Sequence, residues 1–265
     1  MLSIEEIKLL KEKLIRLKGT DWEKFLGEQI ELLENIEKSV DATNQIEIDR
    51  LDKTMDWFRK DLEYKKTYPC TTEPLYDMVR EKIGQFSKTN AYKSLEIGPG
   101  FGTFSKEMRQ WAANYFLDIL PELEEKVRRR FPPPHQKYLT FFLTKQTDCS
   151  NIPQGSCNFV FSWDTFVFFT QKHIQQYLHD IMRVLIPGGY VFIQYADCHF
   201  DHDLKEAKRG YWNYNTKTSM EKIIKDERYE VVEMSQFRPG ANFAIFKKPG
   251  NENPAIYKTN EITLD

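Results

Sequence analysis

The sequence predicts an α/β protein with one mostly parallel seven-stranded sheet, preceded by a helical region. Three observations support this: short apolar runs alternate with helical patterns from residue 92 onward, a glycine-rich turn follows the first run, and the last two runs are joined by a turn alone. The predicted strands are Tyr92–Ile97, Asn114–Ile119, Tyr138–Leu143, Cys157–Ser162, Tyr190–Tyr195, Glu230–Phe237 and Asn242–Lys247.

The connections between these strands favour parallel pairing up to the final pair. Helical patterns such as Pro121–Arg130 and Gln171–Leu185 can carry the chain back across the sheet, as a parallel crossover requires. Between the last two strands, Arg238–Ala241 offers a turn and no helix. The final strand is therefore expected to run antiparallel.

The first 88 residues are expected to be helical. No proline occurs before Pro69, and apolar side chains recur every three or four positions, which is typical of amphipathic helices. The last of these helices is predicted at about Thr72–Gln85. Two interpretations stay open: residues 1–88 pack on the sheet as a plain cap, or they also cover one side of a binding pocket. Residues 89–249 then form the main domain, and residues 250–265 a peripheral tail.

Composition narrows the class of protein. The 265 residues include 38 basic and 40 acidic side chains, so the net charge of −2 gives no overall attraction to nucleic acid. The four cysteines have no C-x-x-C spacing, which argues against a zinc knuckle or a disulfide framework. No apolar run approaches the roughly 18 residues of a membrane span, and the acidic N-terminus is unlike a signal peptide. We expect a cytoplasmic protein without a nucleic-acid or membrane partner.

The segment Glu96–Gly102, with the sequence E-I-G-P-G-F-G, is the most specific motif. A buried strand ends in an acid, a glycine-rich turn follows, and a helical pattern begins at about Thr103, so backbone amides can approach a ligand closely. A dinucleotide site would have the order G-x-G-x-x-G, but Ser105 stands at the third glycine position. The order found here resembles the first motif of class I S-adenosylmethionine-dependent methyltransferases.

That resemblance implies a Rossmann-like sheet with an antiparallel last strand, and S-adenosylmethionine as cofactor, with S-adenosylhomocysteine as product. Asp118 ends the second strand, where a carboxylate can accept the ribose hydroxyls. Asp148 and Cys149 resemble the family segment that meets the adenine, and Leu185–Gly189 resembles a structural turn into the fifth strand. The predicted cofactor-binding residues are Glu96, Gly98, Pro99, Gly100, Asp118, Ile119, Asp148, Cys149 and Ser162.

Within the family, Phe159–Val167 and Tyr211–Asn213 look most like small-molecule and sugar or glycan O-methyltransferases. A cofactor-binding protein without transfer activity, or an enzyme acting on a protein or nitrogen acceptor, are the alternatives. A nicotinamide oxidoreductase is disfavoured because the chain lacks its glycine order and its Tyr-x-x-x-Lys helix motif. A nucleic-acid methyltransferase is disfavoured because no Asn/Asp-Pro-Pro-Tyr strand end is present.

The chemistry is expected after the fourth and fifth strands, where donor and acceptor should meet. An alcohol acceptor benefits from a general base, and the candidates are His199, His202 and Asp164. A divalent metal held by Asp164 and Asp197 is a less favoured alternative, because Cys198 stands where catechol-type enzymes have asparagine. The whole Asp197–Asp203 cluster can also be read as a polar surface loop. Trp57 and Trp212 are the candidate walls of an acceptor pocket.

Overall fold

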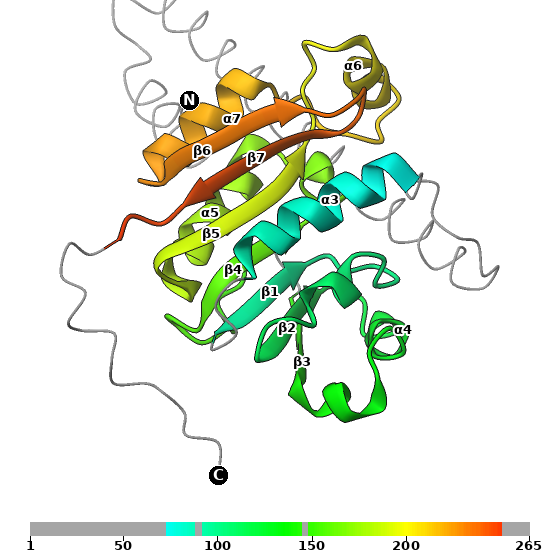
Figure 1. Cartoon of the computed structure of the whole chain (residues 1–265). Helices are drawn as coiled ribbons and strands as arrows, with labels where there is room; N and C mark the ends of the chain where they lie inside the picture. The colour runs from blue at the N-terminus through cyan, green and yellow to red at the C-terminus, as the bar shows by residue number, and fades with distance from the viewer. Residues whose placement is uncertain (1–72, 88–91, 145–147, 251–265) are drawn as a thin grey trace, which may run out of the picture. The chain divides into compact units, whose positions relative to one another are not determined.

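The computed structural model describes residues 73–87, 92–144 and 148–250 (Figure 1). The helices predicted before residue 72, with Trp57, and the tail after residue 250 lie outside the described residues.

Seven strands form one sheet in the order β3-β2-β1-β4-β5-β7-β6. Neighbours from β3 to β5 are parallel, whereas β7 runs antiparallel to both β5 and β6. This confirms the predicted fold class. The strands are β1 (Lys93–Ile97), β2 (Ala113–Asp118), β3 (Leu139–Leu143), β4 (Cys157–Ser162), β5 (Leu185–Tyr195), β6 (Glu230–Gln236) and β7 (Asn242–Lys247).

Helices cover both faces of the sheet, which explains why its central strands are continuous apolar runs (Figure 1). One core contains side chains from α5 and α7, and the core on the other face contains side chains from α3 and α4. The helices are α3 (Glu73–Phe86), α4 (Leu123–Arg128), α5 (Gln171–Val184), α6 (Asp201–Lys208) and α7 (Lys217–Asp226), with 3₁₀ turns η1 (Ser105–Met108), η2 (Pro133–Tyr138) and η3 (Phe166–Phe168).

The prediction of a helix from about Thr103 is wrong, because the structure has only the short 3₁₀ turn η1 there. The chain must return to the start of β2 at Ala113 within ten residues. An α-helix rises about 1.5 Å per residue and a 3₁₀ turn about 2.0 Å, so a short return favours the tighter turn and extended backbone. Elsewhere the differences are at element ends, the largest being the start of β5, which includes the Pro187-Gly188-Gly189 turn.

Helix α3 packs along the sheet with its first turn near the carboxyl ends of the strands. Leu75, Val79 and Ile83 recur every fourth residue and are buried. Tyr76 stacks on Phe104, beyond the glycine turn, with ring centroids 5.5 Å apart. Because α3 supplies part of the core, deleting the chain up to residue 88 would open that core.

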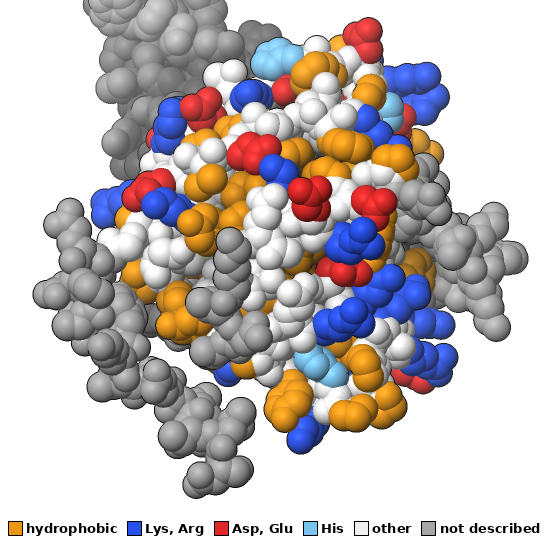
Figure 2. Space-filling model, viewed as in Figure 1, with side chains coloured by type: hydrophobic (Ala, Val, Ile, Leu, Met, Phe, Trp, Pro, Cys, Tyr) orange, Lys and Arg blue, Asp and Glu red, His pale blue; other side chains and the backbone are white. Residues whose placement is uncertain are grey.

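The face drawn in Figure 2 carries both charge signs, with lysine and arginine concentrated beside α4. Arg128, the last residue of α4, pairs with Glu124, and Arg129, directly after the helix, pairs with Glu125. Their charge is therefore partly compensated within the helix. None of the described helices is long and apolar enough to cross a membrane.

Candidate active site

The glycine turn lies where the strand order reverses. Strand β1 pairs with β2 on one side and β4 on the other, and the chain leaves β1 directly into Gly98. The Gly98 amide donates to the Leu117 carbonyl over 2.8 Å, which fixes the start of the turn against β2. In open α/β sheets, ligands bind at such a switch point, at the carboxyl ends of the strands.

The three glycines are required for different reasons, although all have positive φ. A Cβ on Gly98 would overlap the Thr165 side chain, and one on Gly102 would lie 2.9 Å from Arg130 Cγ. Gly100, with φ of +52°, has no atom within 4 Å of the position of a Cβ. Gly98 and Gly102 therefore serve internal packing, whereas Gly100 borders open space.

Glu96 is a buried acid beneath this turn, with 3% of its surface exposed. Its pKa is raised to about 8, chiefly by burial; a hydrogen bond from the Ser105 hydroxyl opposes the rise, and the nearby Asp118 carboxylate adds to it. Ser105 stands where a dinucleotide-binding motif would have its third glycine. The serine at this position therefore provides the hydrogen-bond partner of Glu96.

Asp118 ends β2 as predicted, with its carboxylate facing the glycine turn. Its Oδ1 accepts the amides of Ile119 and Leu120 at 2.7 and 3.1 Å. Burial raises its pKa to about 6, against the lowering effect of hydrogen bonds from the backbone of Leu120, Ile119 and Gly100. Because a carboxylate has about four acceptor positions, at least one is left for a hydroxyl group.

Asp148 and Cys149, which were predicted to contact the adenine, form hydrogen bonds with other residues of the protein. Asp148 Oδ1 accepts the amide and hydroxyl of Ser150, at 3.1 and 2.5 Å. The buried Cys149 donates its amide to Asp180 Oδ2 over 2.9 Å. The Cys149 amide could contact the adenine ring only if its hydrogen bond to Asp180 broke. An open hollow of about 450 Å³ lies beside Asp148, lined by Lys172, Gln175, Gln176, His179, Asp180 and Glu227.

The end of β4 meets β1 and β5. Ser162 is buried and donates its hydroxyl to the Ile97 carbonyl over 2.7 Å, so it ties the two strand ends together. Asp164 has a φ of 56°, and its amide donates to Gln194 Oε1 over 2.6 Å. Left-handed backbone in a residue other than glycine is costly and is often found at functional sites.

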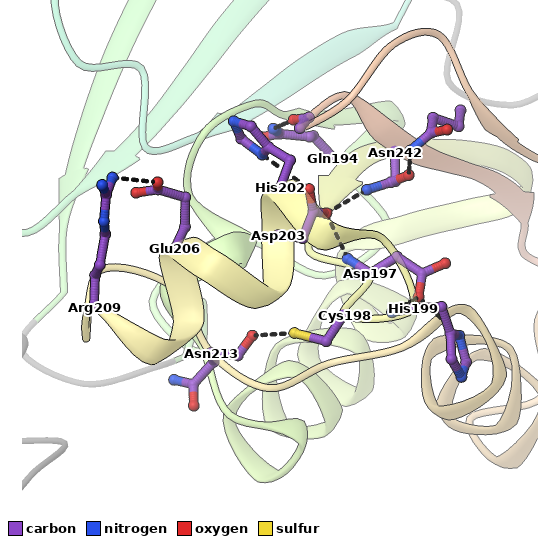
Figure 3. A network of polar contacts seen from close by, with 12 residues as sticks. Gln194, Asp197, Cys198, His199, His202, Asp203, Glu206, Arg209, Asn213 and Asn242 are labelled. Carbon is purple, nitrogen blue, oxygen red and sulfur yellow. Dashed lines mark hydrogen bonds and ion pairs between the residues drawn. The ribbon is translucent and has the colours of Figure 1, made fainter.

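The cluster after β5 contains two histidine–carboxylate pairs (Figure 3). His199 Nδ1 lies 3.0 Å from Asp197 Oδ1, and His202 Nδ1 lies 3.1 Å from Asp203 Oδ1. The His202 ring meets Trp212 edge-on, with centroids 5.5 Å apart. The structure therefore brings one predicted base and one predicted acceptor wall together.

Loop residues after α6 fasten this cluster to the segment after β4. The Asn213 amide donates to the Val167 carbonyl, and the side-chain amides of Asn213 and Asn215 donate to the carbonyls of Phe168 and Phe169, all within 2.9 Å. The carbonyls of the two phenylalanines therefore anchor this loop.

Within the described residues, no group of three or more His, Cys, Asp and Glu side chains is placed to hold a metal ion. Asp197, one of the two acids considered for a metal, uses Oδ1 to accept the amide of His199 and to pair with its ring.

Three residues that join the strand ends were missed from the sequence: Gln194, Asp203 and Asn242. All three are buried polar side chains. Gln194 interrupts an apolar strand, and an internal polar residue of that kind is a usable signal, because buried polar groups need partners. Asp203 lies within the cluster considered, but its burial is not visible in the sequence.

Residues 95–193 match a family model described as a methyltransferase domain. This chain carries a class I S-adenosylmethionine-dependent methyltransferase domain. S-adenosylmethionine is the cofactor of such domains. Among curated proteins, none matches the sequence.

Solved structures similar to the methyltransferase domain share its fold at low sequence identity. The N-methyltransferase NodS from Bradyrhizobium japonicum, with S-adenosyl-L-homocysteine, is 14% identical, with a TM-score of 0.58 over 73% of this chain and 97% of that chain. A complex of the Haloferax volcanii Trm112 activator with a putative methyltransferase matches at 14% identity and a TM-score of 0.57, over 66% and 90%. Geranyl diphosphate C-methyltransferase from Streptomyces coelicolor matches at 9% and 0.55, over 66% and 80%.

Proposed function

We propose that this methyltransferase domain transfers the methyl group of S-adenosylmethionine to a hydroxyl of a small molecule or sugar. One observation carries the proposal. An open glycine turn, the carboxylates of Glu96 and Asp118, and a histidine–carboxylate pair all lie at the edge of the sheet where the parallel strands end. The cofactor supplies a carbon already activated by its sulfonium, so the protein must mainly align the acceptor, exclude water and take up a proton.

The residues at the switch point fit the cofactor. Glu96 is a buried acid suited to the cofactor's cationic amino group, and Asp118 has an acceptor position for a ribose hydroxyl. The space over Gly100 allows close approach to the turn. We assign the adenine end to the Ile119 side of the turn and to Asp148. Cys149 joins it if its bond to Asp180 opens.

The acceptor side follows from the groups after β4 and β5. Asp164, His199 and His202 are the candidate bases, and Trp212 provides an aromatic wall beside His202. Aromatic side chains stack on sugar rings and planar molecules. The structural neighbours include an N- and a C-methyltransferase, so the fold alone does not select the acceptor atom.

The test is methyl transfer to defined acceptors. The full chain is incubated with S-adenosylmethionine and a panel of hydroxylated sugars, phenols and matched amines, and the products are identified by mass spectrometry. We expect a methyl ether from a hydroxyl-bearing member. Methylation confined to the amines would reassign the acceptor atom. Cofactor binding without any methylated product would favour the binding-protein alternative.

Asp118→Ala is expected to weaken cofactor binding by roughly 1.5–3 kcal/mol, the scale of hydrogen bonds to a charged group. Asp118→Asn should lose less, because one acceptor oxygen survives and can still take the Ile119 amide. Calorimetry with S-adenosylhomocysteine measures both. Asp226→Ala, which removes an exposed acid on α7, is the control. Parental affinity in both Asp118 variants would remove Asp118 from the site.

A further inference from the structure

The two histidine–carboxylate pairs after β5 differ in where they point. His202 lies beside the β6–β7 turn, since its Cε1 would be 2.8 Å from a Cβ on Gly240. His199 lies on the other side of the cluster and points away from Gln194 (Figure 3). Its side chain is 62% exposed, against 46% for His202. Of the two rings, His202 is the one held at the strand ends.

The partner of His202 is a fully buried carboxylate. Asp203 Oδ2 accepts the Asp197 amide at 2.8 Å and Asn242 Nδ2 at 2.5 Å, while Oδ1 faces His202 Nδ1. A buried carboxylate is tolerated when hydrogen bonds satisfy it, and here they come from the exit of β5 and the start of β7. A carboxylate at this distance favours the tautomer in which Nδ1 carries the proton and Nε2 presents its lone pair.

Hydrogen bonds connect the β6–β7 turn, beside which His202 lies, to the end of β4. Gln194 Nε2 donates to the Gly240 carbonyl over 2.7 Å, and Gln194 Oε1 accepts the Asp164 amide over 2.6 Å. Strand β5 alone separates β4 from β7 in the sheet. Neighbouring strands lie about 4.8 Å apart, so the ends of β4 and β7 are separated by roughly 10 Å.

We propose that His202 Nε2 takes the proton of the acceptor hydroxyl, and that Asp203 is the positioning residue that fixes its ring and tautomer. The proposal rests on the proposed function. The acceptor oxygen forms a bond to the methyl carbon as the carbon–sulfur bond breaks, and the electron pair of that bond stays on the sulfur. The hydroxyl proton moves to Nε2, so an ether, a neutral thioether and an imidazolium result.

The first test needs no acceptor. Nitrogen-15 NMR of the imidazole groups in the full chain reports which ring nitrogen carries the proton. We expect the Nδ1–H tautomer for His202, and a shift to Nε2–H in Asp203→Asn, whose side-chain amide can donate to Nδ1. An Nε2–H tautomer in the parent protein would overturn the assignment of Asp203, whether or not the protein transfers methyl groups.

The second test is turnover on the hydroxyl acceptor found with the panel. His202→Ala should cut kcat by 10²–10⁴-fold, the typical contribution of a general base, while the Kd for S-adenosylhomocysteine stays the same. Added imidazole should restore part of the rate. Asp203→Asn should lower kcat by a larger factor than it changes KM. Asp226→Ala, which removes an exposed acid on α7, is the control and should retain turnover.

Three results would overturn the role of His202: parental turnover in His202→Ala, loss of turnover in His199→Ala instead, or no hydroxyl methylated by the parent protein. In the last case the proposed function fails as well, and the NMR result then separates the two failures. A tautomer set by Asp203 would show that the pair exists as described but serves another purpose.

Discussion

Gly100→Val will abolish S-adenosylmethionine binding while the protein stays folded. Gly100 has a φ of +52° and borders open space, so a valine side chain would project where the cofactor must approach the backbone. We expect the affinity to fall by roughly 100-fold or more, equivalent to about 2.8 kcal/mol. Calorimetry with S-adenosylhomocysteine measures the loss, and circular dichroism checks the fold.

Gly155→Val is the matched control for that experiment. Gly155 has a φ of +58° and likewise no atom within 4 Å of a Cβ, but it lies in the turn before β4, at the opposite edge of the sheet. Both variants therefore carry similar backbone strain, of about 1–3 kcal/mol. Equal loss of binding in the two would mean that strain is responsible. Parental binding in Gly100→Val would mean that the cofactor does not lie over this turn.

Glu96→Gln will raise the free energy of unfolding at pH 8. It will also lower the affinity for the cofactor. In the folded chain the Glu96 pKa is about 8, whereas an unfolded glutamate has a pKa of about 4.3. Between these values the unfolded chain has lost its proton and the folded chain keeps it. Raising the pH therefore favours unfolding, with a slope of up to about 1.4 kcal/mol per pH unit.

The expected result is a pH-dependent difference between the two proteins. The glutamine keeps the shape and the Ser105 hydrogen bond but cannot ionise, so the free energy of unfolding of the variant should exceed that of the parent increasingly from about pH 4.3 to 8. Urea unfolding at a series of pH values measures it. Asp118, with a pKa raised to about 6, lowers stability with rising pH in both proteins, so the difference between them reports the Glu96 titration and its coupling to Asp118. If the free energies of unfolding of the two proteins differed by the same amount at every pH in this range, the raised pKa of Glu96 in the folded protein would be contradicted.

The sheet could be predicted from the sequence because its strands are local signals. The bounds of β4 and β7 were predicted to the residue, since each is an apolar run between polar turns. The turn η1 could not be predicted, because its form depends on the distance from the end of β1 to the start of β2. That distance is a property of the assembled sheet.

The candidate site was predictable in part for the same reason. The glycine turn and Asp118 are adjacent to strands and are recognised from local order. Asp203, Asn242 and Gln194 are far apart in the sequence, and hydrogen bonds at the assembled strand ends bring them together. The choice between His199 and His202 follows from those long-range contacts, which spacing along the chain does not contain.

The β6–β7 turn has a practical consequence for protein engineering. A short turn with proline and glycine at the tip of a hairpin is ordinarily a safe place for an affinity tag or a fluorescent label. Here the Gly240 carbonyl holds Gln194, and a Cβ at this position would strike His202. An insertion at this tip would disturb the proposed acceptor side directly. The exposed turn Pro153–Gly155, at the opposite edge of the sheet, is the better place for a reporter.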